Sequence, residues 1–277
     1  MKKNKSGTLL LVLMFLLGLS VMLYPTVSDA INRQHQSYAV SNYTQQVDNM
    51  TAADYSVWFD AADRFNAAIA ADPEALYHPD RFPAYDATLD ITGTGIMGYI
   101  TIPKINVELP IYHGTGDAVL QSGAGHLEGT SLPVGGESTH AVISAHRGLP
   151  RAKLFTHLDQ LEVGDTFTVT VLDRVLTYEV DKITIVLPTE VEDLKVVEGR
   201  DYLTLMTCTP YGINTHRLLV RGRRIATPDN LKHIRVTSEA VRIDPIITAP
   251  LMALPLLVVL LVVLLGGGRK KKKHPKP

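Results

Sequence analysis

The chain has 277 residues, a formal net charge of −1 and a single cysteine. That length suits one medium-sized domain with attachments at its ends. Residues 31–245 carry 18 Lys and Arg against 27 Asp and Glu, a net charge near −9, which argues against nucleic acid or an anionic polymer as partner. One cysteine cannot form a disulfide within the chain, so its thiol is buried and inert, reactive, or bridged to another molecule.

Two apolar runs, at 7–24 and 246–265, bracket the chain, and each is about long enough to cross a hydrocarbon core of roughly 30 Å. Cations flank these runs, in the N-terminal residues 1–6 and in the basic tail 266–277. We expect the basic tail to rest on anionic membrane lipid. This pattern predicts two transmembrane helices in the cell membrane, with both termini cytoplasmic and the remainder extracellular. The alternative for the first run is a cleaved signal peptide.

Residues 31–72 are predicted to form a helical N-terminal extension. Thr51 with Asp54 three residues later resembles a capping box, and aromatic residues follow at helical spacing. Asp72-Pro73 is expected to end the helix. The next residues, 73–95, have no strong period, so we interpret them as a loop that is long enough to act as a lid.

Residues 96–228 read as a mainly β domain with many short strands, which predicts a closed antiparallel barrel, and 229–245 as a juxtamembrane linker. A short helix is expected between Leu154 and Leu161. The candidate strands are 98–102, 107–112, 140–146, 166–172, 175–187, 202–208 and 216–224.

Cys208 ends the apolar stretch Tyr202-Leu-Thr-Leu-Met-Thr, and the turn sequence Thr-Pro-Tyr-Gly follows it. A thiol at a strand end beside a loop is accessible while its backbone is held rigid, as a nucleophile requires. A thiol also needs activation, because the thiolate is the reactive form. Cys208 is therefore the candidate nucleophile.

An imidazole near the thiol would supply that activation. His146 is the best candidate, because it ends the strand preceding Arg147-Gly148 just as Cys208 ends its own strand. His216, at the start of the next strand, is second, whereas His140 is expected at the distant end. For each of these a structural, hydrogen-bonded role is the alternative.

A tetrahedral intermediate needs a donor for its oxyanion. Arg217 lies nine residues after Cys208 and returns to the thiol end of the sheet if the two strands pair. A surface ion pair is the alternative role for this arginine.

Four segments in order resemble the signature of class C sortases, the pilin polymerases of Gram-positive bacteria. They are GYITIPKINVELPIYHGT, GHLEGTSLPVGGESTHAVISAHRGLP, LFTHLDQLEVGD and TLMTCTPYGINTHRLLVRGRR, and the likeness covers about Gly93 to Ile225. The resemblance implies a closed eight-stranded sortase-type β-barrel. It also implies Cys208 as nucleophile, His146 as general acid and base, and Arg217 as oxyanion donor.

The same resemblance implies a cysteine transpeptidase that cleaves an LPxTG-type sorting signal between Thr and Gly. The thioacyl enzyme is then resolved by a lysine amine of the next pilin subunit. Class C lids usually carry an Asp-Pro-aromatic triplet, which is absent here, since Asp72-Pro73 is followed by Glu74. Asp80 and Phe82 are the residues we expect to act as the lid.

Two other functions remain open at this point. The same thioacyl enzyme would anchor surface proteins to peptidoglycan if a wall amine resolved it, and a membrane-anchored barrel without catalysis would serve adhesion. No metal-ligand or cofactor motif is recognisable, so neither a metal nor a cofactor is expected.

Overall fold

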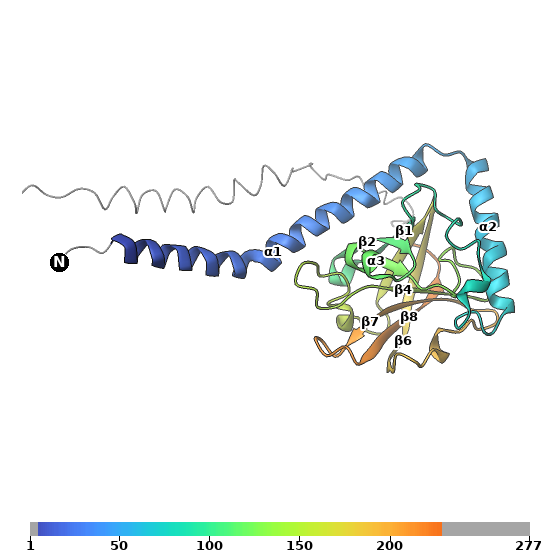
Figure 1. Ribbon diagram of the computed structural model, residues 1–277. Coiled ribbons are helices and arrows are strands. Elements are labelled where there is room, and N and C mark those ends of the chain that lie inside the picture. The colour runs from blue at the N-terminus through green and yellow to red at the C-terminus, as the bar shows by residue number, and fades with distance from the viewer. Residues whose placement is uncertain (1–4, 229–277) are drawn as a thin grey trace, which may run out of the picture.

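The computed structural model describes residues 5–228, in which two long helices precede a closed β-barrel (Figure 1). The predicted linker 229–245, second apolar run 246–265 and basic tail 266–277 lie outside the described residues. Eight strands close the barrel in the order β1-β2-β3-β4-β7-β8-β6-β5. Their bounds are Ile96–Ile102, Val107–His113, Ala124–His126, Thr139–Ser144, Thr166–Val171, Arg174–Val186, Asp201–Thr209 and His216–Ile225 for β1 to β8.

The expectation of a purely antiparallel barrel is wrong for two of its pairs. Strands β2 and β3 are parallel, and so are β4 and β7, while the other neighbours are antiparallel. The chain reaches β3 through the short helix α3, Asp117–Ser122, so β3 can run in the same direction as β2. Parallel pairing carries β4 and β7 to the same end of the barrel.

The seven strands expected from the sequence are present, and β3 is an additional one. Only three residues long and fully buried, β3 offers no alternation that could reveal it. The short helix expected between Leu154 and Leu161 is reduced to a 3₁₀ turn, Leu158–Gln160. Another 3₁₀ turn, Glu192–Leu194, lies in the connection between β6 and β7.

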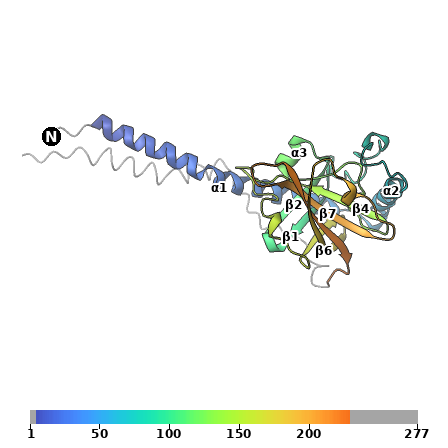
Figure 2. The same ribbon diagram turned by 90° about the horizontal axis from the view of Figure 1, so that it is seen from below.

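The first helix, α1, runs from Lys5 to Asp48 without interruption, so the apolar run and the first part of the helical extension form one element. Figure 1 shows that it changes direction partway, and Pro25 lies inside it, where proline removes a helical hydrogen bond. By length and composition, Met14–Asp48 contains an 18-residue window that is apolar enough to cross a membrane, with a mean hydropathy of 1.5. In Figure 2 the N-terminal half of α1 projects well away from the barrel.

The C-terminal half of α1 packs on the barrel through Tyr43. Its hydroxyl donates to the carbonyl of Met97 at 3.1 Å and accepts from the amide of Leu172 at 2.9 Å. Because the ring is almost fully buried, these bonds satisfy a hydroxyl that would otherwise be costly to bury. Tyr43 thus joins α1 to two separate parts of the barrel.

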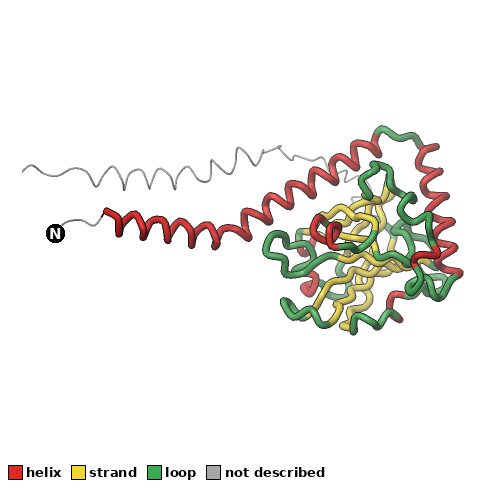
Figure 3. Tube along the Cα trace, in the orientation of Figure 1, coloured by secondary structure: helices red, strands yellow, loops and turns green. Residues whose placement is uncertain are grey.

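The second helix, α2, spans Ala52–Ala71 and lies along the side of the barrel (Figure 3). Its capping box of Thr51 and Asp54 is present as predicted, and it ends immediately before Asp72. Buried Asn66 bonds both backbone groups of Leu132, which docks the helix on the loop before β4.

Candidate active site

Cys208 lies near the end of β7, directly opposite Arg217 on β8. The two residues form one antiparallel pair, so their side chains leave the sheet on the same face. Cys208 is partly exposed. The cysteine and the arginine that the sequence analysis selected are therefore cross-strand neighbours.

His146 follows β4, the strand on the other side of β7. The register of β4 and β7 pairs Ser144 with Met206, and the amide of Ala145 donates to the carbonyl of Met206 at 3.2 Å. The hydroxyl of Thr207 in turn donates to the carbonyl of Ala145 at 2.8 Å. The pairing itself ends at Ser144, and the same parallel register extended by two residues would place His146 beside Cys208, on the side opposite Arg217.

The burial pattern assigns this row of residues to the outer face of the barrel. Leu203 and Leu205 of β7 belong to the main core inside, whereas Met206 packs in a separate small apolar cluster with Leu219 and Leu194. Leu194 comes from the connection between β6 and β7, which therefore covers the outside of the wall. Cys208 has the parity of Met206, so its side chain faces outward as well.

The second-choice histidine, His216, is out of phase with this row. It pairs with Thr209, one position from the Cys208–Arg217 pair, so its side chain points to the other face. Its Nδ1 lies 2.9 Å from the hydroxyl of Thr215. The geometry therefore favours His146 as the partner of the thiol.

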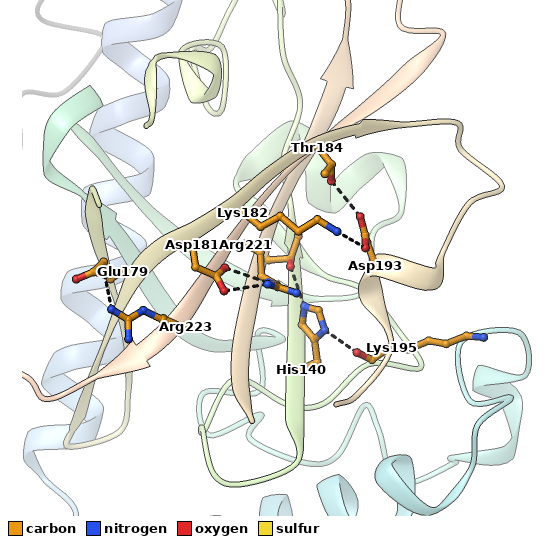
Figure 4. A network of polar contacts seen from close by, with 10 residues as sticks. His140, Glu179, Asp181, Lys182, Thr184, Asp193, Lys195, Arg221 and Arg223 are labelled. Carbon is orange, nitrogen blue, oxygen red and sulfur yellow. Dashed lines mark hydrogen bonds and ion pairs between the residues drawn. The ribbon is translucent and has the colours of Figure 1, made fainter. Parts of the chain in front are cut away.

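His140 lies at the other end of β4, as the sequence analysis expected. Its Nδ1 donates to the carbonyl of Lys195 at 2.9 Å, and its Nε2 lies 2.7 Å from the hydroxyl of Thr204 (Figure 4). Burial lowers the pKa of His140 to about 4, so the imidazole is neutral. This histidine has a structural role in a polar network.

That network anchors the connection between β6 and β7 to the barrel. Arg221 forms a bidentate ion pair with Asp181 at 2.9 and 3.0 Å, and its guanidinium lies 4.1 Å over the ring of Tyr202. Lys182 pairs with Asp193 of the connection at 2.6 Å (Figure 4). With Arg221 engaged in this way, Arg217 is the arginine of β8 that adjoins the thiol.

Arg217 donates from Nη1 to the carbonyl of its neighbour His216 at 3.2 Å, with a longer contact of 3.5 Å to Asn214. Among the described residues, no carboxylate forms an ion pair with it. Its charge is therefore available to an anion that forms at the end of β7. An acyl-transfer intermediate would present such an oxyanion.

Burial lowers the pKa of His146 below its ordinary value. Arg151 acts in the same direction, whereas Asp117 at the start of α3 opposes them. The imidazole is consequently held mostly neutral at neutral pH. A neutral imidazole can accept the proton of a thiol and later return it to a leaving amine.

The expected lid residues lie elsewhere in the described structure. The ring of Phe82 is 5.8 Å from that of Phe65 on α2, and Asp80 is exposed in the 3₁₀ turn Pro79–Arg81. This segment lies beside α2, away from the turn between β7 and β8 (Figure 1). Neither residue has a hydrogen bond or ring contact with the row of candidate residues, and their lid role stays a prediction.

One residue of this region was not recognised from the sequence. Arg147, directly after His146, is largely buried and pairs with Asp159. Its contacts join segments that are far apart in the chain, so only its position next to His146 could have pointed to it. Within residues 5–228, no cluster of His, Cys, Asp and Glu is arranged to hold a metal ion.

Residues 100–225 match the sortase domain family. Among solved structures, sortase C1 of Streptococcus agalactiae is 47% identical, with a TM-score of 0.64, over 69% of this chain and 100% of that one. Sortase C of Streptococcus pneumoniae is 46% identical, with a TM-score of 0.63, over 69% of this chain and 97% of that one.

Curated relatives match over a shorter region. Sortase A of Streptococcus agalactiae is 34% identical over 117 residues, 41% of this chain and 47% of the relative. Sortase D of Bacillus subtilis is 32% identical over 131 residues, 46% of this chain and 63% of the relative. The chain thus spans about half to two thirds of these relatives. With the barrel and the solved structures that align with it, these matches lead to one conclusion: the chain belongs to the sortase family of cysteine transpeptidases, in its class C.

Proposed function

We propose that this chain is a pilin-polymerising sortase that cleaves an LPxTG-type sorting signal and joins pilin subunits through a lysine amine. The observation that carries the proposal is the row formed by the end of β4, Cys208 and Arg217 on three neighbouring strands. A base, a thiol and a cation in one row are the groups that acyl transfer needs. The solved structure of Streptococcus pneumoniae sortase C is presented as giving insight into pilin substrate specificity. That likeness supports pilins as the substrates of this chain.

In the first half-reaction, His146 accepts the proton of the Cys208 thiol, and the thiolate attacks the carbonyl carbon of the threonine in the sorting signal. The carbonyl electron pair moves to oxygen, and Arg217 stabilises the resulting oxyanion. When the intermediate collapses, the bond to glycine breaks. The imidazolium of His146 protonates the departing amine, which leaves a thioester on Cys208.

In the second half-reaction, a neutral lysine amine of the next pilin attacks the thioester. His146 accepts a proton from that amine, and Arg217 again stabilises the oxyanion. The carbon–sulfur bond then breaks, which regenerates the thiol and leaves an isopeptide bond between two pilins. Each proton taken up by His146 is thus returned, and no external acid or base is consumed.

The domain plan that goes with this function is also a proposal. The barrel, residues 96–228, lies outside the cell, and 31–72 and 73–95 cover one side of it. Residues 7–24 and 246–265 span the membrane, and both basic ends face the cytoplasm near anionic lipid. Such an anchor would keep the enzyme beside sorting signals that are still in the membrane.

The proposal is tested by incubating the full-length chain in detergent with wall peptide and with a pilin that carries an LPxTG-type signal. Mass spectrometry of the product should find threonine of one pilin joined to lysine of another. Cys208→Ala is the control, and it should give no product. Products joined only to wall peptide would point to surface-protein anchoring, and absence of any thioacyl species on Cys208 would refute the transpeptidase activity.

A further inference from the structure

Arg147 lies in the loop after His146 and faces the loop that follows Cys208. One terminal nitrogen donates to Asp159, which lies in the 3₁₀ turn Leu158–Gln160. The other terminal nitrogen is 3.5 Å from the hydroxyl of Thr209, the residue directly after Cys208. Because Arg147 also directly follows His146, the residue after the histidine contacts the residue after the thiol.

The side chain of Arg147 is only 9% exposed, and its Nε is buried without a hydrogen-bond partner. Burying a cation with an unsatisfied donor costs free energy, even when an ion pair compensates part of the charge. An apolar residue of similar volume would stabilise the fold at least as well at such a position. The arginine is therefore better explained by a function than by stability.

Tyr211, in the loop after β7, completes the connection. The guanidinium carbon of Arg147 is 5.8 Å from the centre of its ring. The same ring lies against Gly148, where a Cβ would come within 3.1 Å of it, and Gly148 has φ +76°. Glycine is thus favoured at 148 by its backbone conformation and by the approach of the ring. The loops after β4 and β7 are packed against each other through these two residues.

We infer that Arg147 is a positioning residue, which holds the loop of His146 against the loop of Cys208 so that imidazole and thiol stay within reach of each other. This inference rests on the proposed function, because it takes His146 and Cys208 as the reacting pair. It assigns Arg147 no contact with substrate. Asp159, Thr209 and Tyr211 supply the anion, the hydroxyl and the ring against which the guanidinium is fixed.

The test compares Arg147→Met, which keeps an unbranched side chain but removes the guanidinium, with Arg147→Lys in the full-length chain. Lysine keeps the charge that pairs with Asp159 but lacks the planar fork that can also contact Thr209 and stack on Tyr211. The matched control is Arg223→Met. It removes another arginine–carboxylate pair, at 2.7 Å to Glu179, six residues farther along β8 from Arg217.

The readout is the rate at which iodoacetamide labels Cys208 as a function of pH, which requires no pilin. A thiol paired with His146 is labelled at neutral pH, and His146→Ala should shift that profile toward higher pH, where an unassisted thiol ionises. We expect Arg147→Met to shift the profile in the same direction and to slow formation of the thioacyl enzyme about 10²-fold. Arg147→Lys should have the melting temperature of wild type, but its pH profile of Cys208 labelling should stay shifted.

The outcomes separate this inference from the proposed function. If His146→Ala alters the profile and folded Arg147→Met keeps that of wild type, the inference is wrong and the proposed pair stands. If lysine restores the melting temperature and the profile together, Arg147 is merely structural, and the inference is wrong. If His146→Ala itself leaves the profile unchanged, the proposed pair fails and this inference fails with it.

Discussion

Replacing Cys208 with alanine removes a partly exposed sulfur atom from the end of a strand that is paired with β8 from Tyr202 to Thr209. Substitutions at such positions usually change stability by less than about 0.5 kcal/mol, so we expect the melting temperature to stay near that of wild type. Formation of the thioacyl enzyme and of pilin polymers should stop completely. Polymer ladders made by the folded variant would disprove Cys208 as the nucleophile.

Replacing each of the two candidate histidines with alanine in turn tests which one is the base for the thiol. His146→Ala should lower the rate of sorting-signal cleavage by about 10²–10⁴-fold, because it removes the group that accepts and returns the proton. His216→Ala should have a much smaller effect, since its side chain leaves the sheet on the other face from Cys208. A peptide-cleavage assay on both variants distinguishes the two histidines. A larger loss of rate in His216→Ala than in His146→Ala would identify His216 as the base.

Changing Arg217 to lysine keeps the charge but removes the planar fork. If Arg217 stabilises the oxyanion, single-turnover formation of the thioacyl enzyme should slow by roughly 10²–10³-fold, and alanine should slow it further. Arg223→Lys serves as the control, because that arginine pairs with Glu179 far along β8. A lysine variant within about threefold of wild type would fall far short of this range and return Arg217 to a structural role.

Among the elements, the segment between α2 and β1 carries the lid that the sequence predicts around Phe82, which stays a prediction. In the structure the ring of Phe82 packs on Phe65. Nearby, Tyr85 is buried, and its hydroxyl lies 2.9 Å from Nδ1 of His126. These contacts hold the segment against α2 and β3.

On this geometry, Phe82→Ala should act on stability rather than on access to the thiol. We expect a loss below the roughly 3–5 kcal/mol of a fully buried phenylalanine, seen as a melting temperature lower by several degrees. The labelling rate of Cys208 by a small thiol reagent should stay unchanged. Tyr77→Ala, which removes an exposed ring from the same segment, is the control. Faster labelling in Phe82→Ala alone would support the lid predicted from the sequence.

The strands and the capping box of α2 were predictable because they leave local signals. Alternation marks β5, and Thr51 with Asp54 marks the start of α2. The three-residue β3 leaves no such signal. Nor could the parallel pairing of β4 with β7 be read locally, because it joins segments about sixty residues apart.

The candidate site divides in the same way. Cys208, His146 and Arg217 were selected from strand ends and from a family resemblance, and the register of β7 and β8 adds the pairing of the thiol with the arginine. The place of Arg147 depends on Asp159 and Tyr211, which the chain brings together only after the barrel has closed. Contacts of that kind leave no periodicity in a single sequence.

For the molecule as a whole, two buried histidines predict sensitivity to acid. Burial lowers the pKa values of His126 and His140 to about 4, whereas an unfolded histidine titrates near 6.5. Between these values the unfolded chain binds protons that the folded chain does not. The free energy of unfolding must therefore fall as the pH drops from about 6.5 toward 4, by about 1.4 kcal/mol per pH unit for each histidine.

We expect the melting temperature of the full-length chain to fall by at least about 5 °C between pH 7 and pH 5. His140→Gln should remove roughly half of the contribution of these two histidines, because His126 then remains as the other fully buried one. His35→Gln, which changes an exposed histidine on α1, should leave the dependence as in wild type. Equal melting temperatures at both pH values would show that these histidines titrate alike in the folded and unfolded chains.

The unbroken course of α1 has a geometric consequence for the whole enzyme. The near part of this helix contacts the loop after His146, since Asn32 donates to the carbonyl of Arg151 at 2.6 Å, and Asp29 accepts from the amide of Lys153 at 2.8 Å. Each helical residue adds a rotation of about 100° and a rise of about 1.5 Å. If residues 7–24 lie in the bilayer as proposed, one residue inserted between Pro25 and Asp29 would turn the barrel by about 100° about the helix axis. Seven inserted residues would nearly restore the original orientation of the barrel about the helix axis, about 10 Å farther from the membrane. The length of α1 thus determines in which direction the thiol faces and how far it lies from the membrane.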